Sequence, residues 1–328
     1  METFKEAVQI ITFGARKMTN DAYQTVFDER AATTTQVKMK RPHPLPLILR
    51  LIRLGFRIGG TIAPKLAGRM AYKLWFTPSR FPTPASELTV LESAEMEYYK
   101  INSQSIATYS WGQSGPTILL VHGWSGRGTQ LGAFVEPLIN AGFSVLSFDC
   151  PAHGKSSGKQ TNLYEIADVI QALNDHYGPF ESVITHSFGG PCLAVAMQQG
   201  LNTSSVVSIS PPARVTVLVE KFADTLAIPE KAEKNFVRRF EHAFGKNILE
   251  EASMQNMVHE LDMPALVIHD EDDADIPWHD GQAVAQAWKH ASFIKTSTLG
   301  HNRILRDAST IQTAVDFVKS KKSRTELY

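Results

Sequence analysis

The segment of residues 182–190 reads SVITHSFGG and places a serine hydroxyl between a strand-like apolar run and a helix-like run of small residues. A serine at such a turn can act as a nucleophile, because a sharp strand-to-helix turn lifts its hydroxyl above the end of a sheet. The turn requires small side chains where the two backbones pass closely, and Thr185 stands where the G-x-S-x-G pattern has its first glycine. Ser187 is therefore a candidate nucleophile, in a pattern that is common by itself.

Two further groups are needed, because a neutral serine hydroxyl is a poor nucleophile. An imidazole must take its proton, and a carboxylate must orient that imidazole. His301 follows the strand-like run 292–296, and an acidic loop follows the strand-like run 265–269. That loop contains Asp270, Glu271, Asp272, Asp273 and Asp275. A divalent-cation loop is the competing interpretation, but the spacing lacks the glycine and the terminal glutamate of an EF-hand.

Four motifs in chain order resemble those of the α/β-hydrolase superfamily. They are a His-Gly pair after a strand (122–123), an Asp-x-x-x-His-Gly-x-Ser segment (149–156), the serine turn, and the late acid and histidine. The resemblance covers about residues 90–320 and implies an α/β fold of the hydrolase type. We therefore expect a mostly parallel sheet with helices on both faces and a small helical cap.

The resemblance also assigns the candidate site. Ser187 takes the place of the nucleophile and His301 that of the base. The family pattern His-Gly-x-x-Asp-x-x-Val-Pro aligns with residues 269–277 and selects Asp273 as the acid, with Asp270 in place of the glycine. The other four acidic residues are expected to lie in a solvated loop.

Attack on a carbonyl also requires donors for the oxyanion that develops. The resemblance assigns this role to the main-chain N–H groups of Trp124 and Phe188. His122 and His153 belong to loop motifs of the family, and His186 lies inside the serine turn. The segment 149–158 is expected to shape a turn beside the site.

These residues predict a serine hydrolase that cleaves a carboxylic ester through an acyl-enzyme. An acyltransferase or thioesterase on the same fold is the alternative within enzymes. A non-catalytic binding protein is the alternative from another class, because a fold does not establish an activity. Ser187 argues against the dehalogenases and epoxide hydrolases of this fold, which carry an aspartate at the turn.

The chain divides at a proline-rich segment, residues 77–84. We expect residues 1–84 to form a basic amphipathic helical extension with a linker, and residues 85–328 to form the hydrolase domain. Residues 213–260 contain helix-like pieces and no convincing strand, so they are assigned to the cap. Six apolar residues could line a pocket under the cap or form its core, and a core role is expected for most: Phe222, Leu226, Phe236, Phe240, Phe244 and Met254.

Charge is distributed unevenly along the chain. Residues 1–80 hold 14 Lys and Arg against 5 Asp and Glu, whereas the remaining residues hold 19 against 28. The cations at 50, 53, 57, 65, 69 and 73 recur at helical spacing beside Leu, Ile and Phe. One interpretation is an interfacial membrane contact through residues 44–75. The other is that the apolar side packs on the hydrolase domain while the cations stay in water.

Composition restricts the remaining classes. The chain has 328 residues and no net charge, which gives no argument for nucleic-acid binding. The two cysteines, Cys150 and Cys192, have no metal-ligand spacing and are expected to be buried thiols in a reducing compartment. No apolar run reaches the ~20 residues of a spanning helix, and no secretory signal is evident. We therefore expect a cytoplasmic protein with a small acyl ester as its partner, no flavin, nicotinamide or metal cofactor, and an undetermined oligomeric state.

Overall fold

The computed structural model describes residues 46–322, and its centre is one sheet of eight strands. The spatial order is β1-β2-β4-β3-β5-β6-β7-β8. The strands are β1 (Glu95–Ile101), β2 (Gln104–Trp111), β3 (Thr117–Val121), β4 (Ser144–Phe148), β5 (Phe180–His186), β6 (Ser205–Ile209), β7 (Ala265–Asp270) and β8 (Ala291–Thr296). Strands β3 to β8 pair in parallel, whereas β2 pairs antiparallel with both β1 and β4. The predicted α/β-hydrolase architecture is thus confirmed.

Helices cover both faces of the sheet, because successive side chains of a strand point to opposite faces. Leu119 of β3 belongs to one apolar cluster and Leu120 to the other. The first face is covered by α7 (Leu163–Tyr177), α8 (Gly189–Gln198) and α13 (Trp278–Ala287). The second is covered by η1 (Gly128–Phe134), α6 (Val135–Asn140), η3 (Ile304–Arg306) and α15 (Ala308–Lys321). The central parallel strands are buried on both faces and read as continuous apolar runs.

The parallel strands end at the same edge of the sheet, and every candidate residue follows one of these ends. His122 follows β3, Ser187 follows β5, and Asp273 lies three residues after β7. His301 follows β8 and lies in the short helix α14 (Gly300–Arg303). Ligand sites of open parallel sheets form at this edge, so the topology brings residues from distant parts of the chain to one place.

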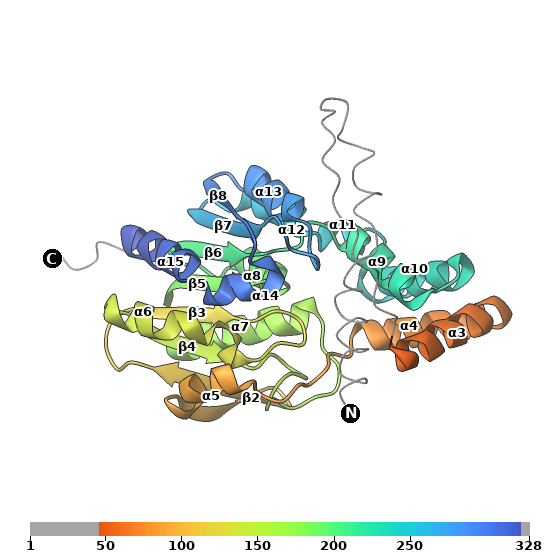
Figure 1. Ribbon diagram of the computed structural model, residues 1–328, viewed down its shortest axis with the longest axis horizontal. Coiled ribbons are helices and arrows are strands. Elements are labelled where there is room, and N and C mark those ends of the chain that lie inside the picture. Colours follow the sequence, from red (N-terminus) through yellow and green to blue (C-terminus); the bar gives the residue numbers. More distant parts are fainter. Residues whose placement is uncertain (1–45, 323–328) are drawn as a thin grey trace.

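The cap lies between β6 and β7 and contains no strand. Its helices are α9 (Val215–Leu226), α10 (Glu230–Phe244), α11 (Ile248–Glu251), α12 (Met254–Met257) and the short η2 (Val258–Glu260). Figure 1 shows this group beside the sheet, at the end opposite α15.

Two N-terminal helices join the cap. Helices α3 (Leu47–Ile62) and α4 (Pro64–Trp75) lie alongside α10 (Figure 1), and a third helix, α5 (Ala85–Glu92), precedes the sheet. The close approach of α4 to α10 depends on Gly68, since a Cβ there would lie 2.8 Å from the main-chain oxygen of Ala232. The first 45 residues of the predicted extension lie outside the described residues.

No helix within residues 46–322 is long and apolar enough to cross a membrane.

Candidate active site

The serine turn has the backbone that a nucleophile elbow requires. Ser187 has a φ of +51°, in the left-handed region that is uncommon for a residue other than glycine. Its main-chain N–H donates to the oxygen of Ile209 (2.8 Å), which ties the turn to the end of β6. Gly189 must be small, because a Cβ there would lie 2.6 Å from the main-chain oxygen of Val121. Thr185 is tolerated because its Oγ1 donates to Ser208 Oγ on the neighbouring strand (3.1 Å).

The base and the acid are in direct contact. His301 Nδ1 lies 2.7 Å from Asp273 Oδ2, and both side chains are buried. A carboxylate only accepts hydrogen bonds, so Nδ1 of a neutral His301 carries the proton and Nε2 carries the lone pair with which a base accepts one. Asp273 Oδ1 accepts from the main-chain N–H groups of Asp275 (2.8 Å) and Ile276 (2.9 Å). This turn fixes the carboxylate toward the imidazole.

A second imidazole contacts the same carboxylate. His269 Nε2, at the end of β7, lies 3.3 Å from Asp273 Oδ2 and 3.0 Å from the main-chain oxygen of Ile276. Both oxygens of Asp273 are therefore engaged by protein donors. Asp273, Asp275 and His301 hold potential ligand atoms within 4.8 Å of one another, but this engagement of Asp273 favours an orienting carboxylate over a metal ligand.

The pair has the electrostatics of a base with its orienting acid. Burial alone would raise the pKa of Asp273, but the adjacent charge and hydrogen bond of His301 and the contact with His269 bring it well below its usual range. Burial alone would lower the pKa of His301, but the charge and hydrogen bond of Asp273 raise it above its usual value. Asp273 is thus ionised at neutral pH, and its charge would stabilise an imidazolium at His301.

Asp270 was expected in a solvated loop, and this expectation is wrong. Its side chain is fully buried at the end of β7. Oδ1 accepts from the main-chain N–H groups of Asp272 (3.0 Å), Leu299 (3.2 Å) and Gly300 (2.8 Å), and Oδ2 accepts from Thr296 Oγ1 (2.7 Å). One carboxylate therefore holds the loop of the acid against the loop of the base. Glu271 and Asp272 are exposed, as expected.

The predicted oxyanion loop lies directly against the serine. A Cβ added at Gly123 would lie 3.0 Å from Ser187 Cβ, so the glycine is needed for this approach. Trp124 is the next residue, and its ring packs edge-on against the ring of Phe188 at 5.3 Å. Two main-chain segments thus lie against Ser187: the one with Trp124 and the one with Phe188. These are the segments to which the family resemblance assigns the oxyanion donors.

Two buried histidines shape this loop and stay neutral. His122 Nδ1 donates to the oxygen of Gly123 (2.7 Å) while its Nε2 accepts from the N–H of Cys150 (3.0 Å). His153 Nε2 accepts from the N–H of Ser125 (2.9 Å). Burial lowers the pKa of His122 to about 4 and that of His153 to about 3. Each ring therefore offers one donor and one acceptor to the main chain.

The proline-rich segment between α4 and α5 is also bound to this region. The guanidinium of Arg80 donates to the main-chain oxygens of Ala152, Gly154, Ser156 and Gly158, and the N–H of Ser79 donates to Ser125 Oγ (2.9 Å). Segment 149–158 is a turn beside the site, as predicted. Arg80 binds its main-chain oxygens. Asp149, within the segment, ties it to the neighbouring loop, because its Oδ1 accepts from the N–H of Gly128 (2.7 Å).

His186 had no assigned role beyond its place in the turn. Its Nε2 donates to the main-chain oxygen of His301 (2.9 Å), and the two rings lie 4.6 Å apart. Burial holds the pKa of His186 well below its usual value, so this ring is neutral. His186, which is adjacent to the candidate nucleophile, thus fixes the main chain of the candidate base. Only the three-dimensional packing reveals this contact, because 115 residues separate the partners.

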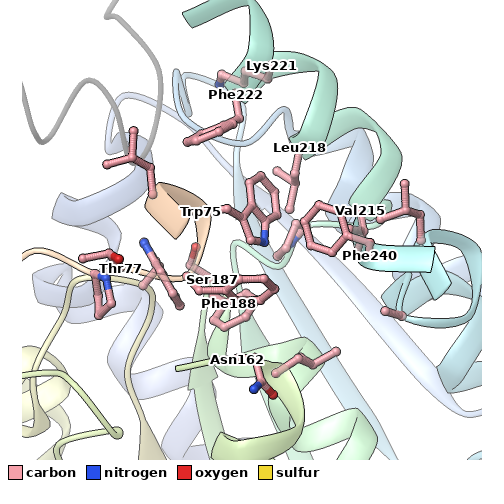
Figure 2. Close-up of a pocket in the computed structure, with 18 of the residues that line it drawn as sticks. Trp75, Thr77, Asn162, Ser187, Phe188, Val215, Leu218, Lys221, Phe222 and Phe240 are labelled. Carbon is pink, nitrogen blue, oxygen red and sulfur yellow. The ribbon is translucent and has the colours of Figure 1, made fainter. Parts of the chain in front are cut away.

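An apolar cavity of about 390 Å³ opens at Ser187. Figure 2 shows Ser187 and Phe188 on the sheet side of this cavity, with Trp75, Phe222 and Phe240 on the cap side. These three rings come from α4, α9 and α10 and pack edge to face, with Trp75 5.2 Å from Phe222 and 5.7 Å from Phe240.

The six apolar cap residues divide between the two expected roles. Phe222, Phe240 and Phe244 line the cavity. Leu226, Phe236 and Met254 are fully buried in the cap and its junction with the sheet. Five of the six belong to the main apolar cluster and Phe244 packs against it, so the expected core role of most of them is confirmed, although three also line the cavity.

A second cavity of about 360 Å³ adjoins the first and is polar. His186, His301 and Arg127 are among its walls, and Trp124 and Asp275 line both cavities. Ser187 therefore faces an apolar space, His301 faces a polar space, and the candidate site lies where the two meet. Lys221 of α9 also lines the apolar cavity and donates to the main-chain oxygen of Asp275 (2.5 Å), which joins the cap to the acid loop.

The fold has many relatives among solved structures. Est1E from Butyrivibrio proteoclasticus, solved with ferulic acid, is 20% identical, with 68% of this chain and 96% of that chain covered and a TM-score of 0.54. An esterase from Pyrococcus furiosus is 18% identical, with 76% and 98% covered and a TM-score of 0.57. Mouse alpha/beta hydrolase domain-containing protein 10 is 16% identical, with 69% and 98% covered and a TM-score of 0.56.

Identities this low establish the fold and not the reaction. No curated protein sequence matches the chain. The sequence model of the alpha/beta hydrolase family matches residues 118–310, which include the predicted oxyanion loop, the serine turn and the candidate acid and base. The chain therefore belongs to the alpha/beta hydrolase family.

Proposed function

We propose that this protein is a serine hydrolase that cleaves a carboxylic ester through an acyl-enzyme. One observation supports it above all. Ser187 is held in a strained turn at the mouth of an apolar cavity, beside an oriented His301–Asp273 pair. Strain of this kind is maintained at functional sites by the surrounding structure.

The reaction follows from the positions of the groups. His301 Nε2 takes the proton of Ser187 Oγ as the oxygen attacks the ester carbonyl carbon. The carbonyl oxygen becomes an oxyanion and is stabilised by the main-chain N–H groups of Trp124 and Phe188. His301 then gives its proton to the leaving alcohol, and the acyl group remains on Ser187. Water then gives a proton to the same imidazole and attacks the acyl-enzyme. The bond to Ser187 Oγ breaks, the imidazole returns the proton to this oxygen, and the carboxylic acid is released.

The two cavities support a division of the substrate. The apolar cavity under the cap matches the acyl part, because its walls are aromatic and aliphatic side chains. The polar cavity beside His301 matches the alcohol part, since the leaving oxygen must receive its proton from that imidazole. We therefore propose an ester with a medium or long acyl chain and a polar alcohol.

Two of the alternative functions would proceed through the same acyl-enzyme, and the third would form no acyl-enzyme. An acyltransferase or a thioesterase would form the same intermediate and differ in the group that accepts or leaves. A non-catalytic binding protein would bind a ligand in the cavity without a reactive serine.

A fluorophosphonate probe tests the proposal, since it labels only an activated serine. We expect the wild-type chain to be labelled at Ser187 and Ser187→Ala to remain unlabelled, with an unchanged Tm. Turnover of nitrophenyl esters of increasing acyl length should then exceed that of matched thioesters, and an added alcohol should not divert the product to a new ester. Absence of labelling in a folded wild-type chain would contradict the proposal and favour the binding protein.

A further inference from the structure

The N-terminal helix pair has an apolar face that remains in solvent. On α3 this face repeats at helical spacing, and α4 continues it. Its members are between 38% and 78% exposed: Leu47, Leu51, Leu54, Ile58 and Ile62 of α3, and Leu66, Met70 and Leu74 of α4. We call these eight residues the outer stripe. Soluble monomers seldom expose a contiguous apolar surface of this kind unless it binds something.

The outer stripe is not required for packing on the cap. The inner faces of the two helices supply that contact with Leu49, Phe56 and Ala71, which are buried in the main apolar cluster. Gly60 of α3 lies against Pro229, since a Cβ there would be 2.6 Å from Pro229 Cδ. The interpretation that an apolar side packs on the hydrolase domain therefore holds for the inner face, whereas a second apolar face points outward.

Cations accompany the outer stripe. Those with exposed side chains on α3 and α4 are Arg50, Arg57, Lys65, Arg69 and Lys73. Arg53 differs, because its guanidinium donates to the main-chain oxygens of Asp224 (3.0 Å) and Thr225 (2.5 Å) at the end of α9. Residues 46–86 contain no acidic residue. A surface that combines apolar side chains with exposed cations is complementary to a bilayer with anionic headgroups.

We propose that α3 and α4 dock in the plane of an anionic lipid bilayer through the outer stripe. The apolar side chains enter the boundary between headgroups and acyl chains, and the neighbouring cations contact the anionic headgroups. The docked face continues into the active-site cavity, because Leu74 belongs to the outer stripe and also lines that cavity with Trp75 and Phe76. Docking itself does not depend on the proposed reaction. The corollary that an ester passes from the bilayer into the cavity rests on the proposed reaction.

Vesicle co-sedimentation of the full chain tests the docking. We expect binding to vesicles that contain phosphatidylglycerol in phosphatidylcholine, and binding weakened at least about fivefold on phosphatidylcholine alone. About 1 M salt should weaken the binding to anionic vesicles, because the Debye length falls to about 3 Å.

Two double variants separate the contribution of the apolar side chains to vesicle binding from that of the cations. The double variant Leu51→Ser with Ile58→Ser should lower the partition coefficient about tenfold or more. The double variant Arg50→Gln with Arg57→Gln should lower it by about 20-fold on anionic vesicles and have little effect on neutral ones. Matched controls are Leu88→Ser on α5 and Lys319→Gln with Lys321→Gln on α15, which should bind as the wild type does. These residues are also exposed, but they lie far from α3 (Figure 1).

Three outcomes would overturn the proposal. The first is a folded wild-type chain that stays in the supernatant with anionic vesicles at low salt, which would mean that residues 1–45 or another partner cover the stripe. The second is a dimer in light scattering that the Leu51→Ser, Ile58→Ser variant converts to a monomer without any change in vesicle binding. The third is equal loss of binding in the controls. Circular dichroism and Tm establish that each variant is folded, and the two lipid compositions test the wild type without any substitution.

Discussion

Asp270 and Gly300 are joined by a hydrogen bond from the Gly300 N–H to Asp270 Oδ1 (2.8 Å). The same oxygen also accepts from the N–H of Asp272 (3.0 Å). One buried carboxylate therefore joins the loop that follows β7 to the loop that follows β8. The acid and the base occupy these two loops. The 2.7 Å contact of Asp273 with His301 is therefore supported by a second carboxylate, which binds the main chain of both loops.

Removal of this support should damage stability and activity together. Asp270→Ala leaves three partly buried main-chain N–H groups without their acceptor, and we expect a loss of about 3 kcal/mol in the free energy of unfolding. We also expect kcat on an activated ester to fall about 100-fold, because a small displacement of His301 disturbs the geometry of proton transfer. Denaturant unfolding and steady-state kinetics measure the two effects.

Glu271→Ala is the matched control. Glu271 is adjacent in sequence but exposed, and its ion pair with Lys295 (2.9 Å) is at the surface. Its loss should cost at most about 1 kcal/mol. Equal effects of the two substitutions would show that Asp270 has no supporting role.

The acid can be identified by comparing three isosteric substitutions. Asp273→Asn should lower kcat by about three to four orders of magnitude, because an amide no longer enforces the tautomer of His301 or stabilises its charged form. Asp272→Asn and Asp275→Asn should each cost less than about tenfold. A larger loss for Asp272 or Asp275 would mean that a different carboxylate orients the base.

The pH dependence should report the charge around His301. Asp273 and Asp275 raise the pKa of His301, whereas its burial and the ammonium of Lys221 lower it. The base works only when neutral, so kcat/KM should fall as the pH drops through a pKa above the usual value of about 6.5.

A substitution at a neighbouring charge should move this pKa without removing the base. Asp275→Asn deletes one negative charge, so the acidic limb of the pH profile should shift to lower pH and activity at low pH should rise relative to the plateau. Lys221→Met deletes a positive charge and should shift the limb to higher pH. If the acidic limb of the kcat/KM profile stayed at the same pH in both variants, this limb would not reflect the pKa of His301.

The local hydropathy pattern of the sequence predicted the strands of the sheet. It did not predict the buried polar contacts of Asp270 and His186 that hold the candidate site together. The apolar runs before Ser187 and at residues 265–269 predicted strands because their side chains are buried on both faces of the sheet. The buried role of Asp270 was missed because three of its four donors come from residues that lie 26 to 30 positions away in the sequence. The contact of His186 with His301 was missed for the same reason.

The N-terminal helices show a further limit. Their periodicity predicted one apolar face, but α3 carries apolar side chains on two sides, with Leu49 buried and Leu51 exposed. A hydropathy pattern does not show which side meets the cap, because that depends on the shape of α10. Glycine positions such as Gly60 and Gly68 indicate the contact only once its partner is known.

Thr185 provides a prediction that runs against the common motif. Thr185→Gly restores the usual glycine of the serine turn, yet it should destabilise the protein. It deletes a buried hydrogen bond to Ser208 (3.1 Å), leaves that hydroxyl without this partner, and adds backbone freedom to the unfolded chain. We expect a loss of about 2 kcal/mol in the free energy of unfolding with kcat within about threefold of wild type. Thr185→Ser, which keeps the hydroxyl, should recover about half of the lost stability. A stabilised Thr185→Gly variant would show instead that the threonine strains the turn.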